Sequence, residues 1–106
     1  MSQGEYRRVA SVADASEGRM LAVDVAGRDI LICHARDGWF ALDNMCTHAF
    51  ARLHEGRLRG SRLICPLHGA SFDCRNGAVL GPPAVVPLKT HAVRIVGDHV
   101  EVALSG

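Results

Sequence analysis

The sequence predicts an all-β protein, an antiparallel β-sandwich into which a small loop-rich unit is inserted. Short stretches of strand-like residues recur along the chain and are separated by two-residue turns such as Asp37-Gly38 and Gly97-Asp98. No segment carries a sustained period of 3.6 residues, so no long helix is expected. The chain has 106 residues, which is enough for one domain but not for two. We therefore expect a single domain over residues 1–106.

Regular strands are predicted at both ends of the chain. Alternation of apolar and polar residues, or an apolar run of strand length, occurs at Tyr6–Ala10, Met20–Val25, Asp29–Ala35, Trp39–Leu42, His91–Val96 and His99–Leu104. The last two stretches flank the Gly97-Asp98 turn and predict a terminal hairpin. We expect residues 1–42 and 84–106 to form the β base together.

The middle of the chain, about residues 43–83, has a different texture. Only two short strands are expected there, Arg62–Cys65 and Ala70–Asp73, and turns are predicted at Glu55-Gly56, Arg59-Gly60 and Asn76-Gly77. Gly81-Pro82-Pro83 then closes the segment. This pattern predicts a small subdomain inserted between the two halves of the base.

Two short motifs in this subdomain carry metal-binding residues. They are Cys46-Thr47-His48 and Cys65-Pro66-Leu67-His68. A zinc finger usually pairs cysteine with cysteine and histidine with histidine, whereas here each motif brings one of each. That arrangement fits a two-iron cluster in which one iron takes both cysteines and the other takes both histidines. A structural zinc site on the same four residues remains an alternative.

The ligand types also predict the electronic character of such a cluster. The charges of two ferric ions, two sulfides and two cysteinates cancel, whereas four cysteinates would leave a dianion. A neutral centre accepts an electron more readily, which raises the reduction potential. If the motifs hold the cluster at their tips, electrons would pass along the imidazole edge of His48 or His68.

Composition excludes several other classes of function. Lys and Arg number 12 against 11 Asp and Glu, with no basic stripe, so nucleic acid is not an expected partner. The charged N-terminus does not resemble a secretory signal, and no apolar run is long enough to span a membrane. We expect a soluble, cytoplasmic monomer in which Cys33 and Cys74 are buried free thiols.

The two motifs and their surroundings resemble Rieske [2Fe-2S] proteins. The segments Cys46-Thr-His48-Ala-Phe-Ala-Arg-Leu and Cys65-Pro-Leu-His68-Gly-Ala-Ser-Phe-Asp73 are most similar to the small ferredoxins of bacterial aromatic-ring-hydroxylating dioxygenases. Gly77 and a Gly-Pro-Pro loop add to the resemblance, which covers nearly the whole chain. In the family that loop covers the cluster, although Gly81-Pro82-Pro83 could also be a simple turn.

The resemblance implies a function and its cofactor. Cys46, His48, Cys65 and His68 would hold a [2Fe-2S] cluster, and the protein would carry one electron from a flavoprotein NAD(P)H-dependent reductase to a terminal ring-hydroxylating oxygenase. It would perform no substrate chemistry itself. Transient docking is expected around the cluster edge, with Phe50, Leu67 and Pro83 as the partner surface. An alternative is the small Rieske-like subunit of an assimilatory nitrite reductase.

Departures from the respiratory branch of the family bear on the reduction potential. That branch has a disulfide bracing the cluster, and this chain has Ala51 and Leu67 at the corresponding positions. Serine and tyrosine hydroxyls that donate hydrogen bonds to the cluster are replaced by Ala70 and Phe72. We therefore expect a potential near the low end of the Rieske range of roughly −150 to +300 mV.

The histidines outside the motifs are expected to be ordinary surface or strand residues. Among them His54 lies between the two motifs in the sequence, so it could also contribute to a partner surface. Asp73 is expected to hold its turn through an Asx-type hydrogen bond.

Overall fold

The computed structural model describes residues 5–67 and 69–105, and this part of the chain contains ten β-strands, two short 3-10 helices and no α-helix. Neither helix in the described ranges is long and apolar enough to cross a membrane. The all-β prediction is therefore confirmed. The elements are β1 (Arg7–Ser11), η1 (Val12–Asp14), β2 (Arg19–Val25), β3 (Arg28–Ala35), β4 (Gly38–Asp43), η2 (Leu53–Glu55), β5 (Arg57–Arg59), β6 (Arg62–Ile64), β7 (Ser71–Asp73), β8 (Val79–Gly81), β9 (Thr90–Val96) and β10 (His99–Ala103).

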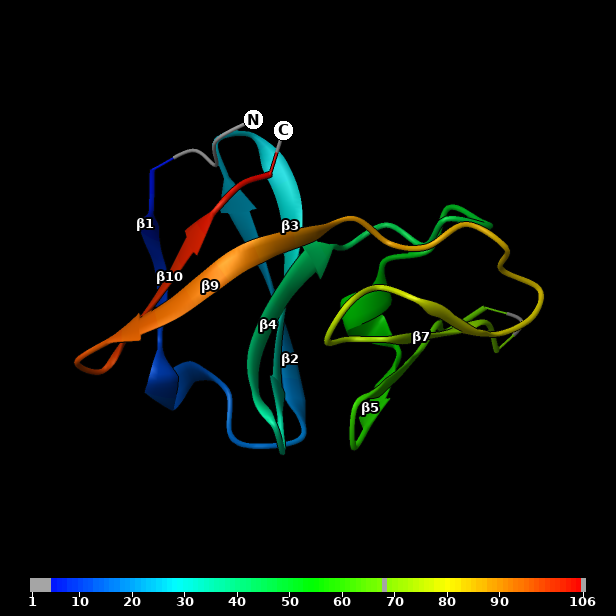
Figure 1. Cartoon of the computed structure of the whole chain (residues 1–106), viewed down its shortest axis with the longest axis horizontal. Helices are drawn as coiled ribbons and strands as arrows, with labels where there is room; N and C mark the ends of the chain where they lie inside the picture. Colours follow the sequence, from blue (N-terminus) through cyan, green and yellow to red (C-terminus); the bar gives the residue numbers. More distant parts are fainter. Residues whose placement is uncertain (1–4, 68, 106) are drawn as a thin grey trace.

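Six strands from both ends of the chain form one antiparallel sheet, which we call the base. Its order is β1-β10-β9-β4-β3-β2, so the N-terminal strand pairs with the C-terminal one. The sheet folds back on itself, and β2, β3 and β4 face the other three strands (Figure 1). An apolar core fills the space between the two halves: Val25, Ile30, Ile32, Ala41, Val100 and Val102.

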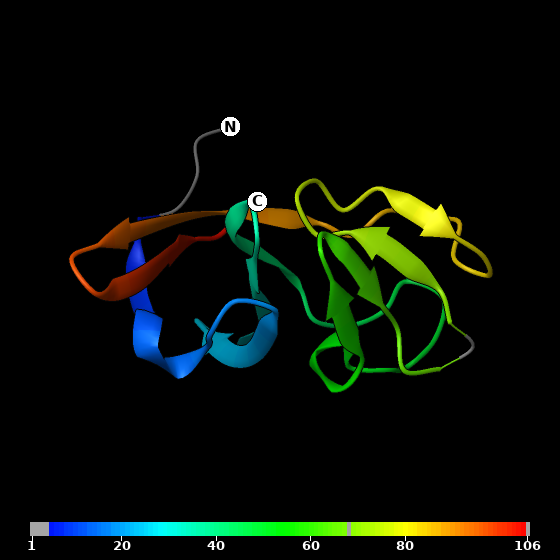
Figure 2. The same cartoon turned by 90° about the horizontal axis from the view of Figure 1, so that it is seen from below.

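The remaining strands form a second antiparallel sheet, in the order β5-β6-β7-β8. We call residues 44–88, which contain this sheet, η2 and the flanking loops, the small unit. Each of its strands has only three residues. Figure 2 shows the small sheet beside the base.

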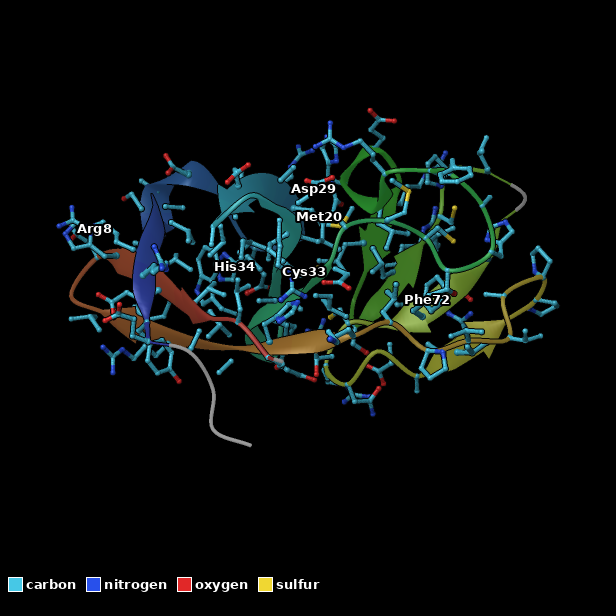
Figure 3. The ribbon with its side chains drawn as sticks, turned by 90° about the horizontal axis from the view of Figure 1, so that it is seen from above. Arg8, Met20, Asp29, Cys33, His34 and Phe72 are labelled. Atoms are coloured by element: carbon cyan, nitrogen blue, oxygen red, sulfur yellow. The ribbon has the colours of Figure 1, made fainter. Side chains whose placement is uncertain are left out.

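Strand β3 contributes to both cores, because both of its faces are buried. Ile30 and Ile32 point into the core of the base, whereas Leu31 and Cys33 belong to the core of the small unit. This explains why the sequence of β3 reads as a continuous apolar run instead of alternating. The half-buried Met20 of β2 packs against the second core, and Figure 3 shows it between the base and the small unit. The small unit therefore rests on the outer face of β3.

The turn between β7 and β8 contacts the segment that precedes β9. Gly77 has a φ of 78°, a left-handed conformation that favours glycine. Its N–H donates to Asp73 O at 2.7 Å, and its carbonyl accepts from Leu88 N at 2.9 Å. A methyl group at Gly77 would collide with the Leu88 carbonyl oxygen. Glycine is required here for both conformation and space.

The predicted elements differ from the structure mainly in the small unit. Sequence patterns predicted β6 and β7 but not β5 or β8, because β5 lies between two predicted turns and β8 ends at the glycine of Gly81-Pro82-Pro83. The turn between β3 and β4 lies at residues 36–37, and Gly38 is already the first residue of β4. The predicted hairpin turn at Asp37-Gly38 was thus displaced by one residue.

Candidate metal centre

The first motif lies on a tight loop between β4 and η2. Met45 and Arg52 pair as an isolated antiparallel bridge, and inside it Cys46 N–H donates to Ala51 O at 2.9 Å. The loop is also tied to the segment before β9, since the Thr47 hydroxyl donates to Val86 O at 2.6 Å. Cys46 and His48 are therefore held at defined places on a closed loop.

The second motif follows β6 and has a similar construction. Cys65 N–H donates to Ala70 O at 2.8 Å, which closes the loop between β6 and β7. Within it, Leu67 N–H points to Cys65 Sγ at 3.4 Å. A backbone N–H directed at sulfur stabilises the anionic, metal-binding form of a cysteine.

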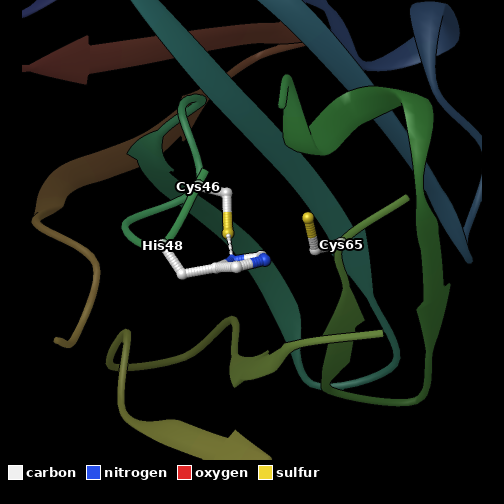
Figure 4. Close-up of side chains that lie close together, drawn as sticks. All are labelled: Cys46, His48 and Cys65. Atoms are coloured by element: carbon white, nitrogen blue, oxygen red, sulfur yellow. Dashed lines mark hydrogen bonds between the residues drawn. The ribbon is translucent and has the colours of Figure 1, made fainter. Parts of the chain in front are cut away.

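The two loops bring three metal-binding side chains together. One donor atom each from Cys46, His48 and Cys65 lies within 4.8 Å of the others. Figure 4 shows the three side chains pointing toward one another, with Cys46 Sγ 2.7 Å from His48 Nδ1. His68, the fourth predicted residue, lies outside the described residues. Two soft thiol sulfurs and an imidazole suit an iron–sulfur cluster, so the residues present fit such a group.

The two cysteines lie in an apolar environment. Cys46 and Cys65 are buried in the core of the small unit, together with Leu53, Ala70 and Phe72. Burial raises the pKa of the Cys65 thiol. Because a metal binds the thiolate, cluster binding must displace a proton from this residue.

Behind the first loop, a hydrogen-bond network is centred on Asn44, which is fully buried. Its backbone N–H donates to Asp29 O, and its carbonyl accepts from Leu53 N. Its Nδ2 group donates to both carboxylate oxygens of Asp29 at 3.2 Å and to His54 Nδ1 at 3.0 Å. Arg52 makes a bidentate ion pair with the same carboxylate at 3.0 Å. The ends of the first loop are thereby tied to each other and to the base.

This network was not predicted from the sequence, although Asn44, Arg52 and His54 flank the first motif, because Asp29, which joins Asn44 to Arg52, lies on β3. His54, for which a surface role was considered, is half-buried and joined to Asn44. His91, expected to be an ordinary surface or strand residue, lies on β9 but is buried. Its Nε2 is 2.8 Å from Asp43 Oδ1, and its Nδ1 accepts from Ser105 N. The contacts of both histidines depend on residues distant in sequence, which no local pattern encodes.

The predicted hydrogen bond at Asp73 is present. Arg75 N–H donates to Asp73 Oδ1 at 2.9 Å, and the Arg75 guanidinium contacts both carboxylate oxygens. These bonds hold the pKa of Asp73 below its usual value. The arrangement fixes the turn at the end of β7.

Exposed apolar side chains surround the metal-binding loops. Of the predicted partner residues, Phe50 is 96% exposed and Leu67 is 44% exposed, and Pro83 is also exposed. Two further residues, Val85 and Val86, are exposed and belong to the segment bonded to Thr47. These valines were not predicted as surface residues, because an apolar pair of β-branched residues is typical of a strand.

Cys33 and Cys74 are fully buried free thiols, as expected. Cys33 lies on β3 and Cys74 follows β7, so the pair connects the two sheets. A hydrogen bond to Cys74, together with burial, raises the pKa of the Cys33 thiol. Neither belongs to the group of potential ligands among the described residues.

The fold and the converging ligand loops define an iron–sulfur protein, and comparison with known proteins identifies its family. Residues 5–92 match the Rieske [2Fe-2S] domain. The chain belongs to this family, and its cofactor is a [2Fe-2S] cluster. The resemblance inferred from the motifs is thus confirmed.

Similar proteins share both sequence and structure with this chain. The ferredoxin component of the naphthalene 1,2-dioxygenase system of Pseudomonas aeruginosa is 38% identical over 89 residues, which are 84% of this chain and 86% of the relative. The ferredoxin of carbazole 1,9a-dioxygenase from Nocardioides aromaticivorans IC177 is 33% identical, with a TM-score of 0.90 over 96% of this chain and 100% of that structure. A complex of reduced oxygenase and oxidized ferredoxin in carbazole 1,9a-dioxygenase matches with 30% identity and a TM-score of 0.87 over 92% of each chain.

Proposed function

We propose that the protein is a one-electron carrier that receives electrons from a flavoprotein NAD(P)H-dependent reductase and passes them to a terminal ring-hydroxylating oxygenase. The observation that carries this proposal is the convergence of Cys46, His48 and Cys65 beside an exposed apolar surface. The similar ferredoxin components of dioxygenase systems support it, and one structural neighbour is a ferredoxin in complex with its oxygenase. The protein performs no substrate chemistry itself. We also propose that it is a cytoplasmic monomer; the free thiols of Cys33 and Cys74 fit the reducing cytoplasm.

The ligand set is Cys46, His48, Cys65 and His68, each motif supplying one cysteine and one histidine. The cluster supplies reversible one-electron chemistry, while the chain orients the ligands and excludes water. Burial of Cys46 and Cys65 excludes water from their sulfur atoms. The imidazole edge of a histidine ligand would give electrons a route to a partner. Gly81-Pro82-Pro83 would limit solvent access as part of a cover, which fits the bond between Thr47 and the following segment.

This ligand assignment is tested by substitution with a matched control. Cys65→Ala and His68→Ala should abolish the cluster, whereas Cys74→Ala, which removes another thiol from the same core, should retain it. Iron and acid-labile sulfide analysis should give about two of each per chain for the wild type and Cys74→Ala. Electron paramagnetic resonance of the reduced protein should show the low average g-value of mixed Cys/His ligation. One zinc per chain in place of iron would overturn the assignment.

Docking occurs through the exposed apolar residues beside the motifs, Phe50, Leu67 and Pro83. Their exposure supports the role, since apolar side chains without cover often mark a binding surface. The interface should be small, because a shuttle must release each partner quickly. Phe50→Ala should slow electron transfer to the oxygenase about tenfold while leaving the cluster spectrum unchanged. An unchanged transfer rate in both Phe50→Ala and Pro83→Ala would remove this surface from the proposal.

The reduction potential should lie near the low end of the Rieske range. Ala70 and Phe72 are fully buried next to Cys65 in the same core and have no side-chain donor to offer a sulfur atom. Without such donors the reduced, more negative form is less stabilised. A low potential fits an electron source at the level of a nicotinamide cofactor.

A further inference from the structure

A hollow of about 320 Å3 opens between the base and the small unit, and its lining does not include Phe50, Leu67 or Pro83. One wall is the start of β2, and the other is formed by η2 and β5. Figure 1 shows the start of β2 and β5 facing each other on the lower side of the molecule. The side chains that line the hollow are Arg19, Met20, His54, Arg57, Leu58 and Arg59, together with two glycines. We call it the arginine hollow.

The three arginines of the hollow are exposed, and none forms an ion pair with any described residue. Four other arginines of the described chain are paired with carboxylates: Arg28, Arg52, Arg75 and Arg94. Among the described residues, no acidic side chain lines the hollow, although Glu17 and Glu55 lie nearby in sequence. The charge of the hollow is therefore positive and is not neutralised by its own lining.

His54 adds a further donor to this lining. Asn44 Nδ2 can only donate, so His54 Nδ1 must accept its hydrogen bond. The orientation of the Asn44 amide is set independently, because its Oδ1 accepts from His54 N and its Nδ2 also faces the Asp29 carboxylate. The neutral His54 ring consequently carries its proton on Nε2. All four polar side chains of the hollow can thus donate hydrogen bonds, and none needs to accept one.

The arrangement on β5 is unfavourable for the isolated protein. Arg57 and Arg59 lie two residues apart and share one face of the strand. Arg59 also stands directly opposite Arg62 of β6. Like charges at opposed positions destabilise a sheet. An anionic occupant would remove this cost, since it would pair with the arginines that lack a carboxylate.

We propose that the arginine hollow is a second docking element, which binds a carboxylate-bearing segment on the surface of a redox partner. The proposal rests on the electron-carrier function above and adds a contact separate from Phe50, Leu67 and Pro83. Bidentate pairing with carboxylates is the chemistry that guanidinium groups favour.

A protein segment fits the hollow better than a tightly bound small anion. The arginines are solvent-exposed and come from both the base and the small unit, so they form a broad and wet surface. Exposed ion pairs contribute little each to affinity. They do accelerate and orient association, which is what a carrier that must release its partner requires. With a net charge of only +1, the chain depends on a local cluster for such steering.

The first test uses the oxidised holoprotein and hexaglutamate as a probe, with binding measured by calorimetry at low ionic strength. The double variant Arg57→Gln/Arg59→Gln should weaken binding about fivefold. The matched control is Arg7→Gln/Arg8→Gln, which removes two exposed arginines from β1 and changes the net charge equally. Figure 3 places Arg8 on the side of the base away from the small unit. The control should change binding less than about twofold.

The outcomes separate the possible occupants. Equal weakening in both double variants would mean that only net charge matters and would overturn the proposal, as would absence of binding by the wild type. Pyrophosphate is titrated in parallel. If it binds more tightly than hexaglutamate and depends on Arg57 and Arg59, the hollow is a small-phosphate site and the partner assignment is wrong.

The second test measures single-turnover electron transfer with the reductase and with the oxygenase at several salt concentrations. For at least one of them, Arg57→Gln/Arg59→Gln should lower the rate constant at low salt about fivefold and flatten its salt dependence, while the control retains both. Unchanged kinetics with both partners would overturn the docking role. If wild-type protein transfers no electrons to the oxygenase, the proposed function fails instead, and the hexaglutamate titration still reports on the hollow.

Discussion

The base and the small unit are stabilised in different ways, although they share strand β3. The strands of the base have five to eight residues and enclose an apolar core of their own. The small unit has strands of three residues, and its core consists partly of the two cysteines at the metal centre and partly of residues from β3 and β4. We therefore expect the base to depend less on the cofactor than the small unit does, although the outer face of β3 is covered by the small unit.

Removal of the cluster should reveal this difference most strongly. We expect amide exchange in residues 45–53 and 65–73 to accelerate at least about 100-fold in the apoprotein, because the ligand loops lose their cross-link. Strands β3, β9 and β10 should keep most of their protection. Hydrogen exchange with mass spectrometry compares the two forms directly. Equal acceleration in both regions would show that the molecule unfolds as one unit.

Gly77→Ala should destabilise the protein by about 3 kcal/mol, since it combines a left-handed backbone with a collision against the Leu88 carbonyl. Gly60→Ala is the matched control, with a φ of 60° and no atom near the added methyl group. It should cost only about 1 kcal/mol. Chemical denaturation of both holoproteins measures the difference. A similar loss of stability in both variants would mean that the Leu88 carbonyl moves aside easily.

Asn44→Ala should cost about 2 kcal/mol and accelerate loss of the cluster, because it leaves buried partners of the amide without hydrogen bonds. The exposed Asn76 makes one side-chain bond, to Ala78 N–H, so Asn76→Ala should cost less than about 1 kcal/mol. Decay of the visible cluster absorbance at constant temperature reports the effect on the site. If both variants lose the cluster at the wild-type rate, the Asn44 network does not stabilise the first loop.

Acid should weaken the contacts of the small unit in a defined pH range. The ion pair with Arg52 lowers the pKa of Asp29, and the bonds from Arg75 lower that of Asp73. A carboxyl group with a lowered folded pKa stabilises the native state above its unfolded value of about 4, and this contribution is lost as the pH falls through the folded pKa. Urea denaturation between about pH 6 and pH 3 should show less acid sensitivity in Asp73→Asn than in wild type. Identical pH profiles would remove Asp73 from this explanation.

Ala70→Ser should have the smallest effect on stability and a specific effect on the cluster. A new donor near sulfur should raise the midpoint potential by roughly 40 mV, the one-electron equivalent of a hydrogen bond worth about 1 kcal/mol. Ala103→Ser, at a buried position of the base, is the control and should leave the potential unchanged. Redox titration monitored by circular dichroism measures both variants. No shift in Ala70→Ser would indicate that cluster charge or exposure sets the potential.

The same difference between regions determined what could be predicted from the sequence. Strands of the base, such as β2 and β10, are long enough to show their pattern, and the cysteine–histidine motifs define the donor set locally. Strands β5 and β8 were missed because they adjoin turn residues, Gly56 and Gly60 beside β5 and Gly81 at the end of β8. The contacts of Asn44 with Asp29 and of His91 with Asp43 were missed because each joins positions far apart in the chain. The arginine hollow arises only when β2 and β5 are brought together.

Burial of both faces of β3 has a consequence for how its alignment is specified. A strand with one polar face cannot slip by one residue without exposing apolar side chains, but the run from Ile30 to Cys33 is apolar on both sides. Hydrophobicity alone therefore does not choose between the two alignments. The alignment of β3 is therefore set by the hairpin turns at its two ends. One is at Ala26-Gly27, where both residues have positive φ, and the other is at residues 36–37. Lengthening either turn by one residue would exchange the side chains that β3 directs into the two cores. The small unit would then lose the packing of Leu31 and Cys33 beneath the metal centre, although no residue near a ligand had changed.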